Sequence, residues 1–220
     1  MRLVFLFIII GTISPCAAFS ASPPLQFPAS ANKLEDFLPE GWRIKSIAKG
    51  DLNKDDLDDY ALMAQFGSMG LLDPELLIIE SGNDKCYRLK VHRSFDNPSE
   101  LEIRGNVLSI IWPWYGIGRA QTDHSIKVRK YKNSEHYRII GEDSDYYDSF
   151  KMEGQTYSAN YIIGLRIIEY YHWGDEKKVI DDKLEEKFAP DVIFVEDYHI
   201  NDDLADIHQY NRRLYRTPPH

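Results

Sequence analysis

Cysteine is nearly absent from this chain. The 220 residues include only two cysteines, Cys16 and Cys86, and the N-terminal pattern described below is expected to remove Cys16. Cys86 then has no internal partner, so disulfides cannot support the fold and stability must come from a hydrophobic core. Cys86 lies in an alternating segment, which favours an inert, half-buried strand cysteine over a nucleophile.

Basic residues are also in short supply. Lysine and arginine number 26 against 35 acidic residues, which gives a formal net charge of −9. Nucleic acids and anionic membrane surfaces recruit clustered Lys and Arg, so this balance disfavours both as partners. It is compatible with binding of cations or of a basic protein surface.

Signatures of catalysis are missing. The sequence has no HExxH spacing for zinc, no Gly-x-Ser-x-Gly elbow and no phosphate loop. The chain is therefore predicted not to be an enzyme. The alternative is a hydrolase whose site is assembled from dispersed His and Asp residues. The histidines are scattered, at His92, His124, His136, His172, His199, His208 and His220.

The N-terminus has the three parts of a secretory signal peptide. A single arginine precedes the apolar run Leu3–Ile10, and small residues follow up to Ala18. A membrane anchor is disfavoured because the run is shorter than the roughly 20 residues that span a bilayer. Residues 1–20 are predicted to be cleaved after Ala18 or Ser20, leaving a periplasmic or secreted protein.

A lipid anchor on Cys16 is the less favoured alternative. A lipobox has a small residue such as Gly or Ala before the cysteine, whereas Pro15 precedes it here. The mature chain is predicted to divide into a flexible lead-in at 21–33, one β-rich domain at 34–200 and a polar C-terminal tail at 201–220, the last with a short helix.

Short alternating segments separated by turn signals dominate the middle of the chain. Gly-Asn pairs mark two of the turns, and no long amphipathic helix is present. The pattern predicts a mainly β fold of antiparallel sheets in one domain, with little helix. Gly164 divides the segment 157–170 into two strands. The other expected strands are 42–47, 60–66, 75–80, 87–93, 101–103, 107–112, 124–131, 136–140 and 192–195, with one helical turn at 33–38. Residues 183–188 are expected to form a short charged strand or a turn.

An acidic loop at 51–59 is the most informative segment. Oxygen-bearing groups recur at every second position, namely Asp51, Asn53, Asp55, the Leu57 carbonyl and Asp59. Calcium takes six to eight hard oxygen ligands, and an alternating loop can direct such groups inward while Leu52 and Lys54 point outward. The loop is therefore predicted to bind Ca²⁺. The alternatives are an empty, solvated turn and a Mg²⁺ or Mn²⁺ site.

Two positions of this loop depart from familiar calcium motifs. Leu62 stands where an EF-hand has its bidentate Glu, so the loop is not an EF-hand. Asp56 stands where Gly is usual because the backbone adopts a positive φ, a conformation that Asp tolerates better than most residues.

The loop resembles the FG-GAP/VCBS type, in which Asp-x-Asn-x-Asp-Gly-x-x-Asp leads into an apolar strand. More widely, the chain resembles small exported bacterial proteins with a single such loop. The segments that carry this wider resemblance are Pro39–Trp42, Ile140–Asp143 with Tyr146 and Tyr147, and Asn160–Gly164. The resemblance implies a β fold and a calcium loop but no activity. One loop alone does not imply a propeller.

Two further segments are candidates for binding. Trp112, Trp114 and Tyr115 form either a core-capping loop or an exposed partner-binding loop, since Trp and Tyr are frequent in binding hot spots. The acidic stretch 143–148, which includes Tyr146 and Tyr147, is interpreted as a solvated turn, with a second cation site or a ligand surface as the alternative. The cluster at 197–206 is interpreted as a solvated tail or helix cap.

Together these features predict an exported, non-catalytic β domain. Calcium would be structural, because closing the loop around an ion ties two strands together. The domain would present its loops to an envelope or protein partner, and one version of this hypothesis is an inhibitor or immunity protein.

Overall fold

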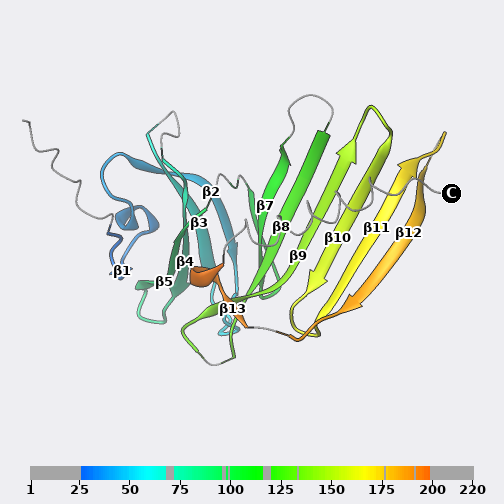
Figure 1. The fold of residues 1–220 in the computed structure, drawn as a ribbon. Helices are drawn as coiled ribbons and strands as arrows, with labels where there is room; N and C mark the ends of the chain where they lie inside the picture. Colours follow the sequence, from blue (N-terminus) through cyan, green and yellow to red (C-terminus); the bar gives the residue numbers. More distant parts are fainter. Residues whose placement is uncertain are drawn as a thin grey trace, which may run out of the picture.

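The chain forms two antiparallel β-sheets (Figure 1). The computed structural model describes residues 26–67, 72–95, 98, 100–115, 120–132, 134–175, 177–190 and 192–198, without the side chains of 113–115 and 120. Strands account for 62% of the described residues and helical residues for 5%. The predicted mainly β fold is confirmed. Among the described residues, no helix has the length and apolar character needed to cross a bilayer.

The smaller sheet has five strands in the order β1-β5-β4-β3-β2. A short 3-10 helix, η1 (Leu34–Phe37), precedes β2 where one helical turn was expected. The strands are β1 (Ser30–Ala31), β2 (Trp42–Gly50), β3 (Asp59–Phe66), β4 (Glu75–Ser81) and β5 (Tyr87–Ser94). The acidic loop connects β2 to β3.

The larger sheet follows the order β12-β11-β10-β9-β8-β7-β6, and β13 pairs with β9. Every neighbouring pair is antiparallel and joins strands that are consecutive in the chain, apart from β13. The strands are β6 (Glu100–Arg104), β7 (Val107–Tyr115), β8 (Ala120–Lys130), β9 (Tyr137–Asp148), β10 (Glu153–Asn160), β11 (Leu165–Trp173), β12 (Lys178–Lys187) and β13 (Ile193–Phe194), followed by the 3-10 helix η2 (Val195–Asp197).

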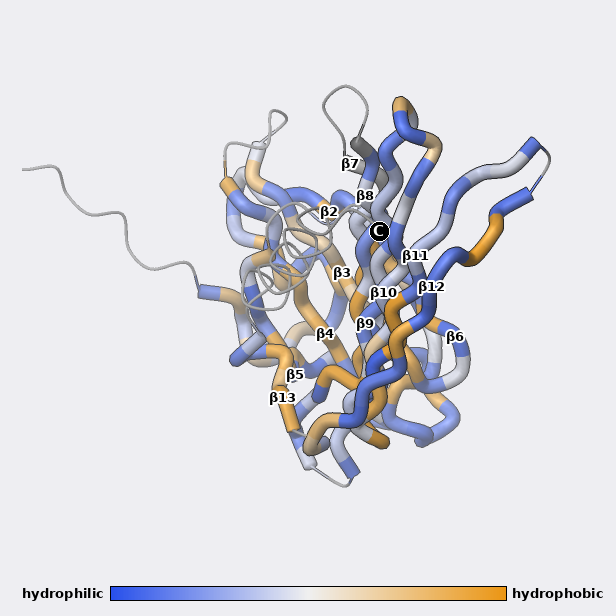
Figure 2. Tube along the Cα trace, turned by 45° about the vertical axis from the view of Figure 1, so that its right-hand side comes forward, coloured by the Kyte–Doolittle hydropathy of each residue, from blue (hydrophilic) through white to orange (hydrophobic). Residues whose placement is uncertain are grey.

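One face of each sheet contributes to a shared core. Met63 of β3 and Ile78 of β4 belong to the same buried cluster as Ile110 of β7 and Ile126 of β8. Figure 2 shows the apolar stretches of β3 and β4 running through the middle of the molecule. Because side chains alternate along a strand, the opposite face of β8 and β9 is left to polar residues.

The central strands of the smaller sheet, β3 and β4, are buried on both faces. The second face of this sheet packs Leu62, Leu77 and Ile79 against Phe37 of η1, which is fully buried. This explains why residues 76–79 form an unbroken apolar run instead of alternating, since a strand covered on both sides has no solvent-facing positions. Accordingly, none of the Leu and Ile side chains in this run is exposed to solvent.

The structure corrects one prediction about the acidic stretch. Residues 143–148 do not form a solvated turn, because they are the second half of β9. The predicted division near Gly164 is confirmed: β10 and β11 are joined by a tight turn in which Gly164 has a φ of +64°. The predicted signal peptide and the predicted C-terminal tail at 201–220 lie outside the described residues, as do residues 21–25 of the predicted lead-in. In the rest of that lead-in, Ser30–Ala31 form β1, which pairs with β5.

Candidate functional site

The acidic loop is closed by hydrogen bonds from its own backbone. The Asp51 carboxylate accepts the amide hydrogens of Lys54, Asp55 and Asp56 at 2.6, 3.2 and 3.2 Å. Asn53 Oδ1 accepts the Asp55 amide at 3.0 Å, and Asp55 Oδ1 accepts the Leu57 amide at 2.9 Å. Asp56 has a φ of +64°, which confirms the backbone conformation expected at the usual glycine position.

Asp59 fastens this loop to the smaller sheet. Its side chain is fully buried, and Oδ2 accepts the amides of Leu52 and Asn53 at 2.9 and 3.2 Å. Oδ1 accepts the amide of Ser81, at the end of β4, at 3.0 Å. Burial raises the pKa of Asp59 to about 6, although the bonds from Ser81 and Leu52 oppose the shift. Asp59 is thus the link between the loop and two strands.

Calcium binding by the loop stays a prediction. Among the described residues, no three His, Cys, Asp or Glu side chains form a metal-binding group. The donor chemistry suits Ca²⁺, because Asp51, Asn53 and Asp55 offer oxygen.

One detail of the expected loop was wrong: Leu52 does not point outward but is 1% exposed, within the shared core.

The structure also corrects the expected binding role of Trp112. This indole is only 6% exposed, and its ring centroid lies 5.7 Å from that of Phe95 and 5.2 Å from that of His124. A buried ring offers no surface to a partner, so Trp112 serves the core. The side chains of Trp114 and Tyr115 lie outside the described part of the structure.

The polar outer face of β8 and β9 carries the best candidate site. In the antiparallel register Gln121 faces Tyr147, and Asp123 faces Asp145. Positions two residues apart share a face, so these side chains stand together on the side away from the core. The next pair along, Ser125 and Asp143, continues the row.

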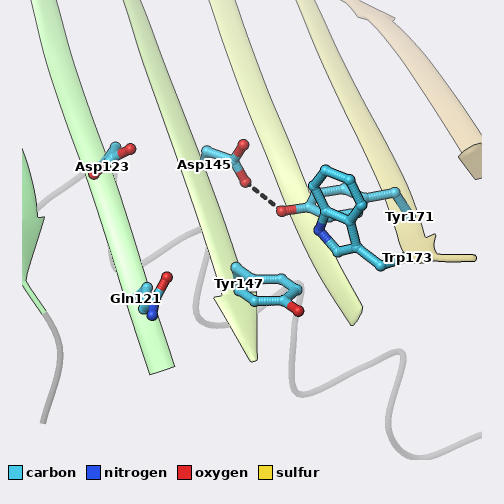
Figure 3. A pocket seen from close by; sticks show the side chains of 6 residues that line it. All are labelled: Gln121, Asp123, Asp145, Tyr147, Tyr171 and Trp173. Atoms are coloured by element: carbon cyan, nitrogen blue, oxygen red, sulfur yellow. Dashed lines mark hydrogen bonds between the residues drawn. The ribbon is translucent and has the colours of Figure 1, made fainter. Parts of the chain in front are cut away.

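Two adjoining hollows lie on this face. One has a volume of about 320 Å³ and is lined by Gln121, Asp123, Asp145, Tyr147, Tyr171 and Trp173 (Figure 3). The other, of about 410 Å³, shares Asp123 and Asp145 with it and includes Ser125, Asp143, Thr156 and Ser158. We call the two hollows together the acidic groove. Each lies within the size range of small-ligand pockets.

Gly154 allows a tyrosine to cross the floor of the groove. A Cβ atom at this position would lie 2.2 Å from Cζ of Tyr171, which faces Gly154 from β11. Because Gly154 has no side chain, Tyr171 reaches over β10 and donates its hydroxyl hydrogen to Asp145 Oδ1 at 2.7 Å. Burial, followed by this bond, raises the pKa of Tyr171, so the hydroxyl remains a donor at neutral pH.

Acid and aromatic groups dominate the lining of the groove. Among the residues that the structure describes, its lining includes three carboxylates and no lysine or arginine. The rings of Tyr147 and Tyr171 are parallel, with an interplanar angle of 5° and centroids 6.4 Å apart. Trp173 is 44% exposed. An exposed indole beside carboxylates is suited to contact a ligand that is both cationic and partly apolar.

Cations already lie at the rim of the groove. Asp143 forms an ion pair with Lys127 and accepts the hydroxyl hydrogen of Ser158 at 2.7 Å. Lys178 of β12 lies 3.9 Å from Asp145 Oδ2. The carboxylates of the groove are therefore positioned to bind positive charge.

The hydrolase alternative receives little support from the histidines. His172 lies 2.7 Å from Asp181, and His92 lies 2.8 Å from Glu75. The base of a catalytic triad makes this kind of contact with a carboxylate. Neither ring has a serine, threonine or cysteine partner in the part of the chain that the structure describes. His124 is buried near Glu142, with Nε2 and Oε1 3.6 Å apart.

Of the strands that form the groove, only β9 carried a segment that the sequence indicated as a candidate site. The stretch 143–148 was recognised as acidic and aromatic, and the structure brings Asp143, Asp145 and Tyr147 into the groove while Tyr146 alternates to the other face. Gln121, Asp123, Tyr171 and Trp173 were missed. The alternation Gln121-x-Asp123-x-Ser125 was a usable signal, but the pairing of β8 with β9 was needed to interpret it.

No known protein family, curated protein or solved structure matches this chain. The resemblance to FG-GAP/VCBS loops therefore stays a prediction from the loop residues. Function has to be inferred from the chemistry of the site itself.

Proposed function

We propose that this protein is an exported, non-catalytic binding domain that recognises a basic protein partner through the acidic groove. The observation that carries this proposal is the gathering of Asp123, Asp143 and Asp145 beside exposed aromatic surface on one rigid sheet face. An inhibitor or immunity protein of the cell envelope fits this description, and the N-terminal export pattern supports that location.

Charge and rigidity support the same proposal. The chain has a net charge of −9, which favours encounter with basic surfaces over acidic ones. The site residues stand on paired strands, so little conformational entropy is lost when a partner binds. Trp and Tyr at the edge of the groove supply the apolar contact that interface hot spots use.

The proposed role of the groove in binding a basic partner is tested by removing its negative charges. The triple variant Asp123→Asn, Asp143→Asn, Asp145→Asn is expected to bind a peptide of alternating Lys and Gly about tenfold more weakly than the wild type. Three exposed ion pairs worth about 0.5 kcal/mol each account for that factor. Binding is measured by isothermal titration at low and at physiological salt, and thermal melting verifies the fold.

A matched variant controls for net charge. The substitutions Asp181→Asn, Asp182→Asn and Glu185→Gln remove the same three charges from β12, where all three residues are exposed, and are expected to leave peptide affinity within about twofold. Equal losses in both variants would mean that the peptide senses only overall charge, and the proposed site would be rejected.

We also propose that the loop 51–59 takes up Ca²⁺ as a structural ion. At 5 mM calcium, an affinity typical of extracellular modules stabilises the fold by about 1 kcal/mol, seen as a rise of about 2–4 °C in Tm. Asp55→Ala is expected to abolish the rise, and magnesium at the same concentration to give little of it. A Tm that calcium leaves unmoved would mean that hydrogen bonds alone close the loop.

A further inference from the structure

Lys178 extends from β12 over the acidic groove. Its Nζ lies 3.8 Å from the centroid of the Tyr171 ring and 3.9 Å from Asp145 Oδ2. Lys178 faces Trp173 across the β11–β12 pair, and Trp173 lines the same hollow. The side chain is 31% exposed, so water and solutes reach this position.

This position stabilises an ammonium group in two ways. The π face of a tyrosine attracts a cation within about 6 Å of its centroid, and a carboxylate about 4 Å away adds Coulomb attraction. Asp145 uses Oδ1 to accept the Tyr171 hydroxyl, which leaves Oδ2 turned to the cation. The tyrosine ring is itself immobilised by burial and by that hydrogen bond.

We propose that this spot is the recognition subsite for a lysine-type ammonium of the basic partner, and that Lys178 is a tethered occupant which the partner's ammonium displaces. The proposal rests on the proposed function and specifies its ligand chemistry. A free Lys178 swings out on its flexible four-carbon stem, so displacement requires no movement of the sheet.

A cation is favoured over an anionic or neutral ligand by the lining of the groove. Asp123, Asp143 and Asp145 repel anions, and no lysine or arginine of the described part of the chain lines either hollow. The residue that the chain itself places over Tyr171 is a primary ammonium. It therefore shows which chemical group this arrangement of ring and carboxylate accommodates.

The inference is tested with a small probe, N-α-acetyl-lysine methylamide, titrated while the Trp173 indole N–H signal is followed by NMR. Lys178→Ala is expected to bind the probe about two- to fivefold more tightly than the wild type, because a cation–π contact at an exposed site is worth about 0.5–1 kcal/mol and its loss frees the subsite. Asp145→Asn in the Lys178→Ala background is expected to remove that gain.

Lys183→Ala is the matched control. Lys183 lies on the same strand and pairs with Glu169 and Glu185 instead of with the groove. The Lys183→Ala substitution removes the same charge as Lys178→Ala. An equal gain in probe affinity in both variants would therefore reflect net charge only and would overturn the inference. Weaker binding in Lys178→Ala would overturn it as well, since Lys178 would then be helping to hold the probe.

Failure of the two proposals can be told apart. If the lysine peptide depends on the three groove carboxylates but Lys178→Ala does not favour the small probe, the groove binds basic partners without a subsite at Tyr171. If the small probe responds as expected while the peptide does not depend on the groove, the subsite exists and the proposed protein partner is rejected.

Discussion

Replacing Asp59 with alanine is expected to lower the free energy of unfolding by about 3–4 kcal/mol. The carboxylate is fully buried and accepts three backbone amides, those of Leu52, Asn53 and Ser81. Each buried donor left without an acceptor costs about 1–3 kcal/mol. The change is measured by urea unfolding in the presence of EDTA, so that lost metal binding does not contribute.

Asp58→Ala is the control for this experiment. Asp58 is exposed and forms a surface ion pair with Lys49 at 2.8 Å, and surface pairs contribute little to stability. Ser81 donates its hydroxyl to the Asp58 backbone carbonyl, which the substitution keeps. If the two alanine variants were equally stable, Asp59 would not be the link between the loop and β4.

The second large effect concerns pH and His124. This ring is 6% exposed, and burial lowers its pKa to about 4, against about 6.5 in the unfolded chain. The unfolded state therefore binds a proton first. The contribution of neutral His124 to stability is fully present above pH 6.5 and is lost as the pH falls towards 4. The loss between pH 7.5 and 4.5 is about 2–3 kcal/mol.

A comparison with His124→Gln isolates this contribution. Every other titrating group, including the nearby Glu142 and Asp143, is common to both proteins. The drop in unfolding free energy from pH 7.5 to 4.5 is expected to be about 2–3 kcal/mol larger in the wild type than in the variant. Identical pH profiles would show that the imidazole accepts a proton inside the fold without penalty, and an NMR titration of His124 would then give a pKa near 6.5.

The sequence predicted most of the strands because their signals are local. Alternation, turn residues and Gly164 depend on neighbouring positions only, so β2, β3, β4 and β5 begin within a residue of where they were expected. The main error came from residues 143–148. Acidic residues usually indicate a turn, but here they occupy the solvent face of a long strand whose other face holds the buried Glu142 and Ser144.

The acidic groove shows the limit of such reasoning. Asp123, Asp145 and Tyr171 are far apart in the sequence, and each is unremarkable within its own segment. They meet because β8, β9, β10 and β11 pair in one register, and a shift of one residue would turn Asp145 toward the core.

The amino-acid sequence by itself determined that this chain is a β protein, where most of its strands and turns fall, and that residues 51–59 form a tight acidic loop. These properties follow from side-chain alternation and from backbone conformations set by a few residues. Only the tertiary structure decided which carboxylates are buried links, as Asp59 is, and which face solvent in a common groove. Burial and long-range register depend on how the sheets pair and pack, and no local pattern encodes either.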